Sequence, residues 1–202
     1  MKNLDNFPAI VTLKRRMQSL AVLDALLCPE WEFRYFFYDK NWGSRETMGS
    51  IRNGSGDEVF ALFSDAGCFI KEFYHERSVI DEAYAHVPVE FLEATQEPAF
   101  SPENVTACYW RRSQSSCWDV NEDGKQFDPA ISFLLAAVDG KPETYEAFAM
   151  DYYEQVLPAD FAAQIFQHQT LTVSKVNSVA YSGNPKELKK EIDGIGYPHS
   201  LF

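Results

Sequence analysis

The stretch EVFALFSDAGCFIKEFY (Glu58–Tyr74) decides the fold class of this 202-residue chain. Its two halves, 58–64 and 68–74, are apolar and aromatic runs of the length typical of β-strands. Between them, Asp65 can hydrogen-bond to its own backbone and Gly67 can adopt a positive φ, so the stretch predicts an antiparallel hairpin. Apolar residues fall on both faces of 58–64, which indicates a strand inside a sheet.

Further elements are expected on both sides of this hairpin. Residues 8–27 have the pattern of an amphipathic helix, with Gln18 and Ser19 outside its apolar stripe. Residues 31–38 (WEFRYFFY) place aromatic residues at a period of two, which predicts a strand, and 104–111 (NVTACYWR) predicts another. A short helix is expected over 88–95, and the polar segment 113–128 is expected to be a loop.

The remainder of the chain has a helical pattern. We expect helices over 131–138, 142–152, 159–166, 171–180 and 185–193, several of which begin at a proline. The sequence therefore predicts one α+β domain over 1–202: an N-terminal helix, an antiparallel sheet with a hairpin, and a C-terminal bundle of short helices. The strand-rich part is 30–112. The helical part, 128–196, either packs on the sheet or forms a subdomain.

Charge limits the classes of partner. The chain has 30 acidic and 18 basic residues, for a net charge of −12. Residues 119–160 hold ten acids and two bases, a net of −8: Asp119, Glu122, Asp123, Asp128, Asp139, Glu143, Glu146, Asp151, Glu154 and Asp160 against Lys125 and Lys141. Such a field repels nucleic acids and anionic membranes and attracts basic proteins. We therefore expect a basic protein partner and neither nucleic acid nor membrane.

The cysteines and the N-terminal segment indicate a compartment. Four cysteines (Cys28, Cys68, Cys108 and Cys117) show no metal-binding spacing. No apolar run is long enough for a membrane span, and the first residues do not resemble a signal peptide. We expect a cytoplasmic protein with reduced, mostly buried thiols, no metal and no cofactor.

The segment DKNWGSRETMGSIRNGSGD (39–57) is expected to be a long loop between two strands. Long ordered loops often carry function, so its side chains are binding candidates. These candidates are Trp42, Arg45, Arg52 and Asp57, together with Glu58 directly after them. The glycine-rich turn at 53–57 could hold an anion on its amides. It does not have the spacing of a phosphate-binding loop, and Arg52 could simply pair with Asp57 or Glu58.

Three more residues complete the candidate binding set. His75 and Glu76 follow the hairpin and could act as acid and base or as metal ligands, although a histidine hydrogen-bonded to a carboxylate is the simpler interpretation. Trp118 lies in a polar segment and could contact a partner or fold back over the sheet. No nucleophile motif occurs, so we assign no catalytic residue.

Several runs of sequence resemble a family of uncharacterised bacterial cytosolic proteins. They are MGSIRNGSGDEVFALFSDAGCFIKEFYHE (Met48–Glu76), EPAFSPENVTACYWRR (Glu97–Arg112), GKPETYEAFAMDYYE (Gly140–Glu154) and IGYP (Ile195–Pro198). The resemblance covers most of the chain from about Trp31 and carries no functional residues with it. In size and acidity the family is similar, by analogy, to the immunity proteins that accompany bacterial toxins.

Three functional hypotheses follow from these observations. The first is a non-enzymatic binding protein, resembling an immunity protein, that engages a basic partner through its acidic surface. The second is a small-molecule-binding protein or enzyme with a site between 42–58 and the sheet. The third is a homodimer formed through an exposed sheet edge or helix face.

Overall fold

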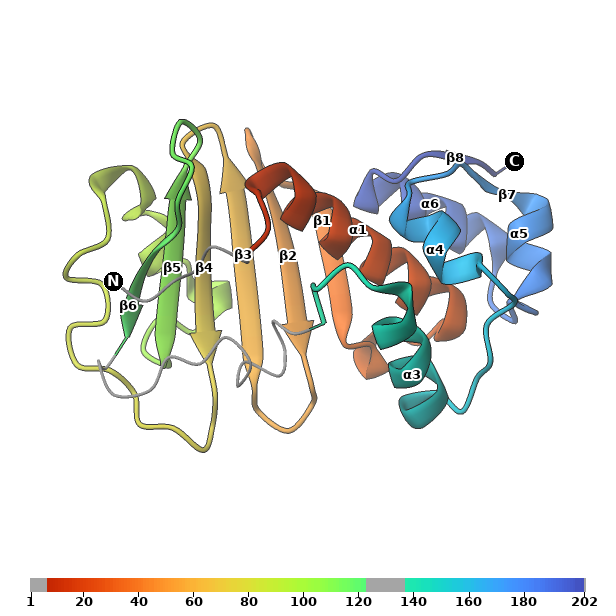
Figure 1. Ribbon diagram of the computed structural model, residues 1–202, viewed down its shortest axis with the longest axis horizontal. Coiled ribbons are helices and arrows are strands. Elements are labelled where there is room, and N and C mark those ends of the chain that lie inside the picture. Colours follow the sequence, from red (N-terminus) through yellow and green to blue (C-terminus); the bar gives the residue numbers. More distant parts are fainter. Residues whose placement is uncertain (1–6, 123–136, 202) are drawn as a thin grey trace.

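The computed structural model describes residues 7–122 and 137–201 and has the expected α+β class (Figure 1). Six strands form one antiparallel sheet in which each strand pairs with the next along the chain. The strands are β1 (Phe36–Gly43), β2 (Glu46–Arg52), β3 (Glu58–Ser64), β4 (Gly67–Phe73), β5 (Ala107–Arg112) and β6 (Asp119–Glu122). The hairpin predicted from Glu58–Tyr74 is β3–β4, and β3 lies inside the sheet as expected.

The helices form a second region beside the first strand. They are α1 (Ile10–Leu27), α3 (Pro142–Tyr152), α4 (Phe161–Phe166), α5 (Val173–Ser178) and α6 (Pro185–Ile195), with a parallel pair of short strands, β7 (Leu171–Thr172) and β8 (His199–Ser200). The sequence therefore located each of these helices to within a few residues. The expected helix 131–138 falls largely outside the described residues.

Helix α1 lies between the sheet and the C-terminal helices (Figure 1). From Met17 to Leu27 every residue of α1 is buried. Gln18 and Ser19, which lie outside the apolar stripe of the sequence pattern, are nevertheless buried, because the C-terminal helices cover that side. The Gln18 side-chain amide donates to the Ile195 carbonyl at 3.0 Å, and the Ser19 hydroxyl donates to the Ile165 carbonyl at 3.0 Å.

The opposite face of the sheet is covered by the segment 74–106, which connects β4 to β5 (Figure 1). Its aromatic side chains Phe91 and Phe100 join Phe60 and Phe69 of the sheet in a separate apolar cluster. The helix expected over 88–95 is instead a series of short 3₁₀ turns. Both faces of the central strands are therefore buried.

The prediction of a long loop over 39–57 is wrong. Most of this segment is the end of β1, a tight turn and the whole of β2. The glycines and serines of this segment suggested turns. Gly49, however, lies where β2 packs closely against α1: a Cβ there would lie 2.7 Å from the Met17 methyl of α1. A glycine in a strand often marks such a close approach. The turn after β2 is confined to residues 53–57.

Two other boundaries differ from the sequence prediction. Residues Trp31–Phe33 form a 3₁₀ turn, and the strand expected from Trp31 begins only at Phe36. In the segment expected to be a loop, Asp119–Glu122 pairs with β5 as the edge strand β6. An edge strand pairs on one side only, and this pairing is enough to hold a short strand of polar sequence. Asp119–Glu122 therefore lacks the apolar pattern by which a strand is predicted. Cys28, Cys68 and Cys108 are buried and free, as expected, while Cys117 is exposed.

We expect Gly67→Ala to destabilise the protein by about 3 kcal/mol, measured by chemical denaturation. Gly67 has a φ of +143°, and a Cβ at this position would overlap the backbone carbonyl of Arg111 on β5. Gly54→Ala is the matched control, since Gly54 also has a positive φ, +70°, but a Cβ there would meet nothing within 4 Å. Equal losses in the two variants would contradict this account of the hairpin.

Candidate functional site: the buried Asp24 and the cavity beside α3

Four of the residues singled out in the sequence gather at one end of β2, β3 and β4. Arg52 and Glu58 are paired across β2 and β3. Buried Asp57 accepts hydrogen bonds from the His75 backbone amide at 2.8 Å and from His75 Nδ1 at 2.6 Å. Burial opposes the ionisation of Asp57, but the bonds from His75 and Asn53 outweigh it and hold its pKa below the ordinary value. This is the simpler of the two interpretations of His75, a strand-end histidine bonded to a carboxylate.

Glu58 is engaged with a lysine that the sequence analysis did not consider. Lys71 of β4 is buried, with an ammonium 2.7 Å from the Glu58 carboxylate and within 6 Å of the ring centres of Phe60 and Phe73. Burial lowers the pKa of Lys71 despite this pairing. Arg52 remains exposed. The Glu58–Lys71 pair therefore belongs to the packing of the sheet.

The glycine-rich turn at 53–57 bonds to itself. The Asn53 side-chain oxygen accepts hydrogen bonds from the amides of Ser55 at 2.9 Å and Asp57 at 3.1 Å, and its Nδ2 donates to Asp57 at 2.7 Å. Two of the amides that could have held an anion are therefore already occupied. The turn positions Asp57 for His75.

The other candidates lie elsewhere. Trp42 is half-buried and stacks on Phe100, while Arg45 pairs with Asp65 at the opposite end of the strands. Glu76 is exposed. Trp118 is 7% exposed and donates its indole N–H to the Pro8 carbonyl at 2.9 Å, so it belongs to the core. Arg52, Asp57, Glu58 and His75 thus form one group, the other four candidates lie apart from it, and none of the eight lines either of the cavities described below.

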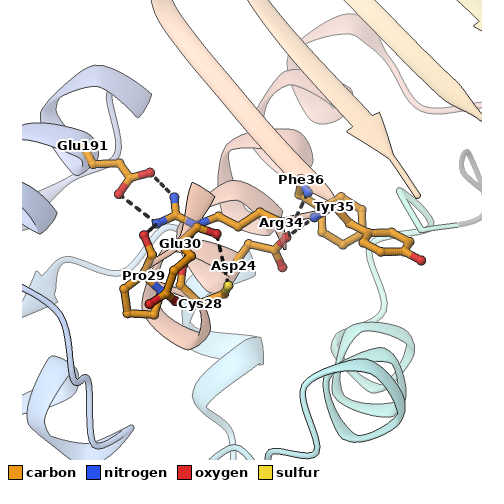
Figure 2. A network of polar contacts seen from close by, with 8 residues as sticks. All are labelled: Asp24, Cys28, Pro29, Glu30, Arg34, Tyr35, Phe36 and Glu191. Carbon is orange, nitrogen blue, oxygen red and sulfur yellow. Dashed lines mark hydrogen bonds and ion pairs between the residues drawn. The ribbon is translucent and has the colours of Figure 1, made fainter. Parts of the chain in front are cut away.

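A different site is built around Asp24, which the sequence analysis missed. The side chain of Asp24 is fully buried in α1. One carboxylate oxygen accepts hydrogen bonds from the backbone amides of Tyr35 and Phe36, each at 2.9 Å (Figure 2). The other oxygen accepts one from the Tyr145 hydroxyl at 2.8 Å. One carboxylate therefore joins α1, the start of β1 and α3. The available signal was an acid in the apolar run AVLDALL (21–27).

Arg34 extends this network to α6 (Figure 2). Its guanidinium donates to the backbone carbonyls of Cys28 and Pro29 and forms a two-pronged ion pair with Glu191. The Arg34 side chain is only 6% exposed. These bonds hold the reversal of the chain between α1 and β1, which explains why residues 31–35 do not continue the strand.

Burial raises the pKa of Asp24 to about 6, although the hydrogen bonds from Phe36, Tyr145 and Tyr35 act to lower it. The Tyr153 hydroxyl interacts with the same carboxylate, yet it makes no hydrogen bond of good geometry within the described residues. A carboxyl titrating near neutrality inside an apolar core is unusual, and such groups cluster at functional sites.

A cavity of about 390 Å³ lies beside this network, between α3, α1 and the first two strands. Its lining is mostly apolar and aromatic: Leu20, Tyr35, Phe36, Ile51, Ala137, Thr144, Tyr145, Ala147, Phe148 and Asp151. Ala147 and Asp151 are exposed and mark its mouth. The volume falls within the range of small-molecule sites. A second, smaller cavity of about 210 Å³ lies between β1 and α6, next to Arg34 and Glu191.

The comparisons do not supply a function for this site. No family model, curated protein or solved structure matches the chain. Within the described ranges, no group of three or more His, Cys, Asp or Glu side chains is arranged to hold a metal ion. None of the helices described here is long and apolar enough to cross a membrane. The functional argument therefore depends on the geometry of the described residues.

The titration of Asp24 makes stability depend on pH. The folded protein keeps this carboxyl protonated up to about pH 6, whereas the unfolded chain ionises it near 3.8. The folded state therefore binds more protons between these values, and the free energy of unfolding falls as pH rises through them, by about 3 kcal/mol in total. We expect Asp24→Asn to remove this component.

The measurement is the free energy of unfolding of the wild-type protein minus that of Asp24→Asn, by urea denaturation across the acidic range. The subtraction cancels titrations that the two proteins share. A difference that does not change with pH would show that Asp24 ionises normally in the folded protein.

Proposed function

We propose that this protein is a non-enzymatic, cytoplasmic binding protein that engages a basic protein partner. An immunity-type role, in which the partner is a toxin, is the specific form of this proposal. The contact surface is the α3 face, which we define as the exposed residues of α3 and of the neighbouring turn after α1: Glu30, Trp31, Glu32, Phe33, Glu143, Met150, Asp151, Tyr152 and Glu154. The observation that carries the proposal is the combination of exposed aromatic residues and unpaired acids on this one face.

The acids of the α3 face have no basic partners within the described part of the chain. Among residues 137–160 there are six acids and a single base, Lys141: the acids are Asp139, Glu143, Glu146, Asp151, Glu154 and Asp160. The ion pairs of the described residues involve none of them. Unpaired charges of one sign steer and orient a partner of the opposite sign.

The aromatic residues of the α3 face provide contact area. Trp31 is 64% exposed, Phe33 57% and Tyr152 42%. They lie together, because the Tyr152 hydroxyl donates to the Phe33 carbonyl at 3.0 Å. Large aromatic side chains contribute most to the binding energy of protein interfaces. The α3 face, on which aromatic side chains lie among acids, is complementary to a partner surface on which apolar side chains lie among lysines and arginines.

The first partner to test is the product of the neighbouring reading frame, co-expressed with this protein. We expect the double reversal Asp151→Lys with Glu154→Lys to weaken the complex by about tenfold or more, measured by calorimetry, and the wild-type affinity to fall with salt. The matched control is Asp81→Lys with Glu93→Lys, which changes net charge equally at exposed positions in the segment 74–106.

Equal losses from the two double variants would show that only net charge matters and would remove the α3 face from the proposal. A dimer of this chain alone in light scattering, abolished by the same α3 substitutions, would assign the face to self-association instead.

We also expect Trp31→Ala to weaken the complex by about 2 kcal/mol, as at an interface hot spot, while leaving the melting temperature nearly unchanged because the side chain is exposed. Val89→Ala is the control, since Val89 is 79% exposed but lies in the segment 74–106. Unchanged affinity for Trp31→Ala would exclude the aromatic part of the α3 face from the interface.

A further inference from the structure

We propose that the cavity beside α3 binds a small organic cation with an apolar body, such as an arylalkyl amine. This inference does not depend on the proposed protein partner, because it rests on the lining of the cavity, which shares only Asp151 with the α3 face.

Two of the α3 residues that line the cavity, Thr144 and Ala147, have small side chains. Thr144, Ala147, Phe148 and Asp151 all line it and lie at helical spacing, so they share one side of α3. Leucine at position 147 would fill part of the space. Ala147 leaves the mouth open to solvent, and Leu20 and Ile51 close the opposite end.

Aromatic rings line the cavity and select an apolar ligand. Tyr35 and Phe36 of the chain reversal and β1 contact Phe148 of α3, with ring centres 5.0 and 5.4 Å apart. Tyr145 lies 6.0 Å from Phe36 in the same group. The face of such a ring attracts a cation, most strongly where water is excluded. The same rings bury the apolar body of a ligand.

The described residues that line the cavity carry charge of one sign. Asp151 is the charged side chain of the lining, and it is exposed at the mouth. Behind the wall lies the Asp24 carboxyl, whose hydrogen-bond donors are Tyr35, Phe36 and Tyr145, all three of them lining residues. Among the described residues, no lysine, arginine or histidine lines the cavity. A carboxylate ligand would meet repulsion and no donor of opposite charge, whereas an ammonium would meet Asp151 and the rings.

The test compares three probes of one shape: phenylpropylamine, phenylpropanol and phenylpropionate, titrated into the full chain and followed by amide NMR shifts. We expect the amine to bind about tenfold more tightly than the alcohol and the acid not to bind. The shifts of the amine should centre on Tyr35, Tyr145 and Phe148. Asp151→Asn should reduce the preference for the amine over the alcohol.

A substitution that fills the mouth of the cavity supplies the structural control. Ala147→Trp should abolish amine binding, and Met150→Trp should not, because Met150 is exposed on the same helix but does not line the cavity. If Ala147→Trp does not fold, Ala147→Leu makes the same test with a smaller side chain. Equal affinity for the three probes, or amine binding that survives both substitutions at 147, would overturn the inference. Neither result bears on the protein partner, which the Trp31 variant tests at a residue outside the cavity lining.

Discussion

The carboxylate of Asp24 is the interaction on which the rest of the structure depends. A buried charge is costly unless it is hydrogen-bonded, and here the donors come from the chain reversal at Tyr35, from β1 and from α3. The same contacts fix where the first strand starts and how far α3 stands from it. The cavity beside α3 lies at this junction, and Tyr35, Phe36 and Tyr145, which donate to Asp24, are among its lining residues.

Much of the fold follows from local patterns in the sequence. The hairpin of β3 and β4 has strong strand formers and a turn with suitable residues, and the C-terminal helices have clear starting residues such as Pro142 and Asn184. These elements agree with their tertiary surroundings. Their local preferences were therefore sufficient to predict them, with differences of only a few residues at the ends.

The errors share a physical cause, which is burial supplied by distant parts of the chain. From the sequence alone, Gly49 has the properties of a turn residue, but in the structure Met17 occupies the space above it. Gln18 and Ser19 are polar, but they are buried because distant backbone carbonyls accept their hydrogen bonds. The candidate site shows the same effect. His75 and Asp57 were singled out and do lie together, but Asp24 was missed because its hydrogen-bond donors follow 11 to 121 positions later in the chain.

The position of α1 has a consequence for how the chain is made. This helix is synthesised well before the elements that cover its outer side, α4 and α6. Contacts so distant in sequence close large loops and form slowly. Until then an apolar strip of α1 has no neighbour, so chains released early would leave it uncovered and prone to associate with one another. Translation through α6 is thus a condition for this protein to remain dispersed, because α6 completes the cover over α1.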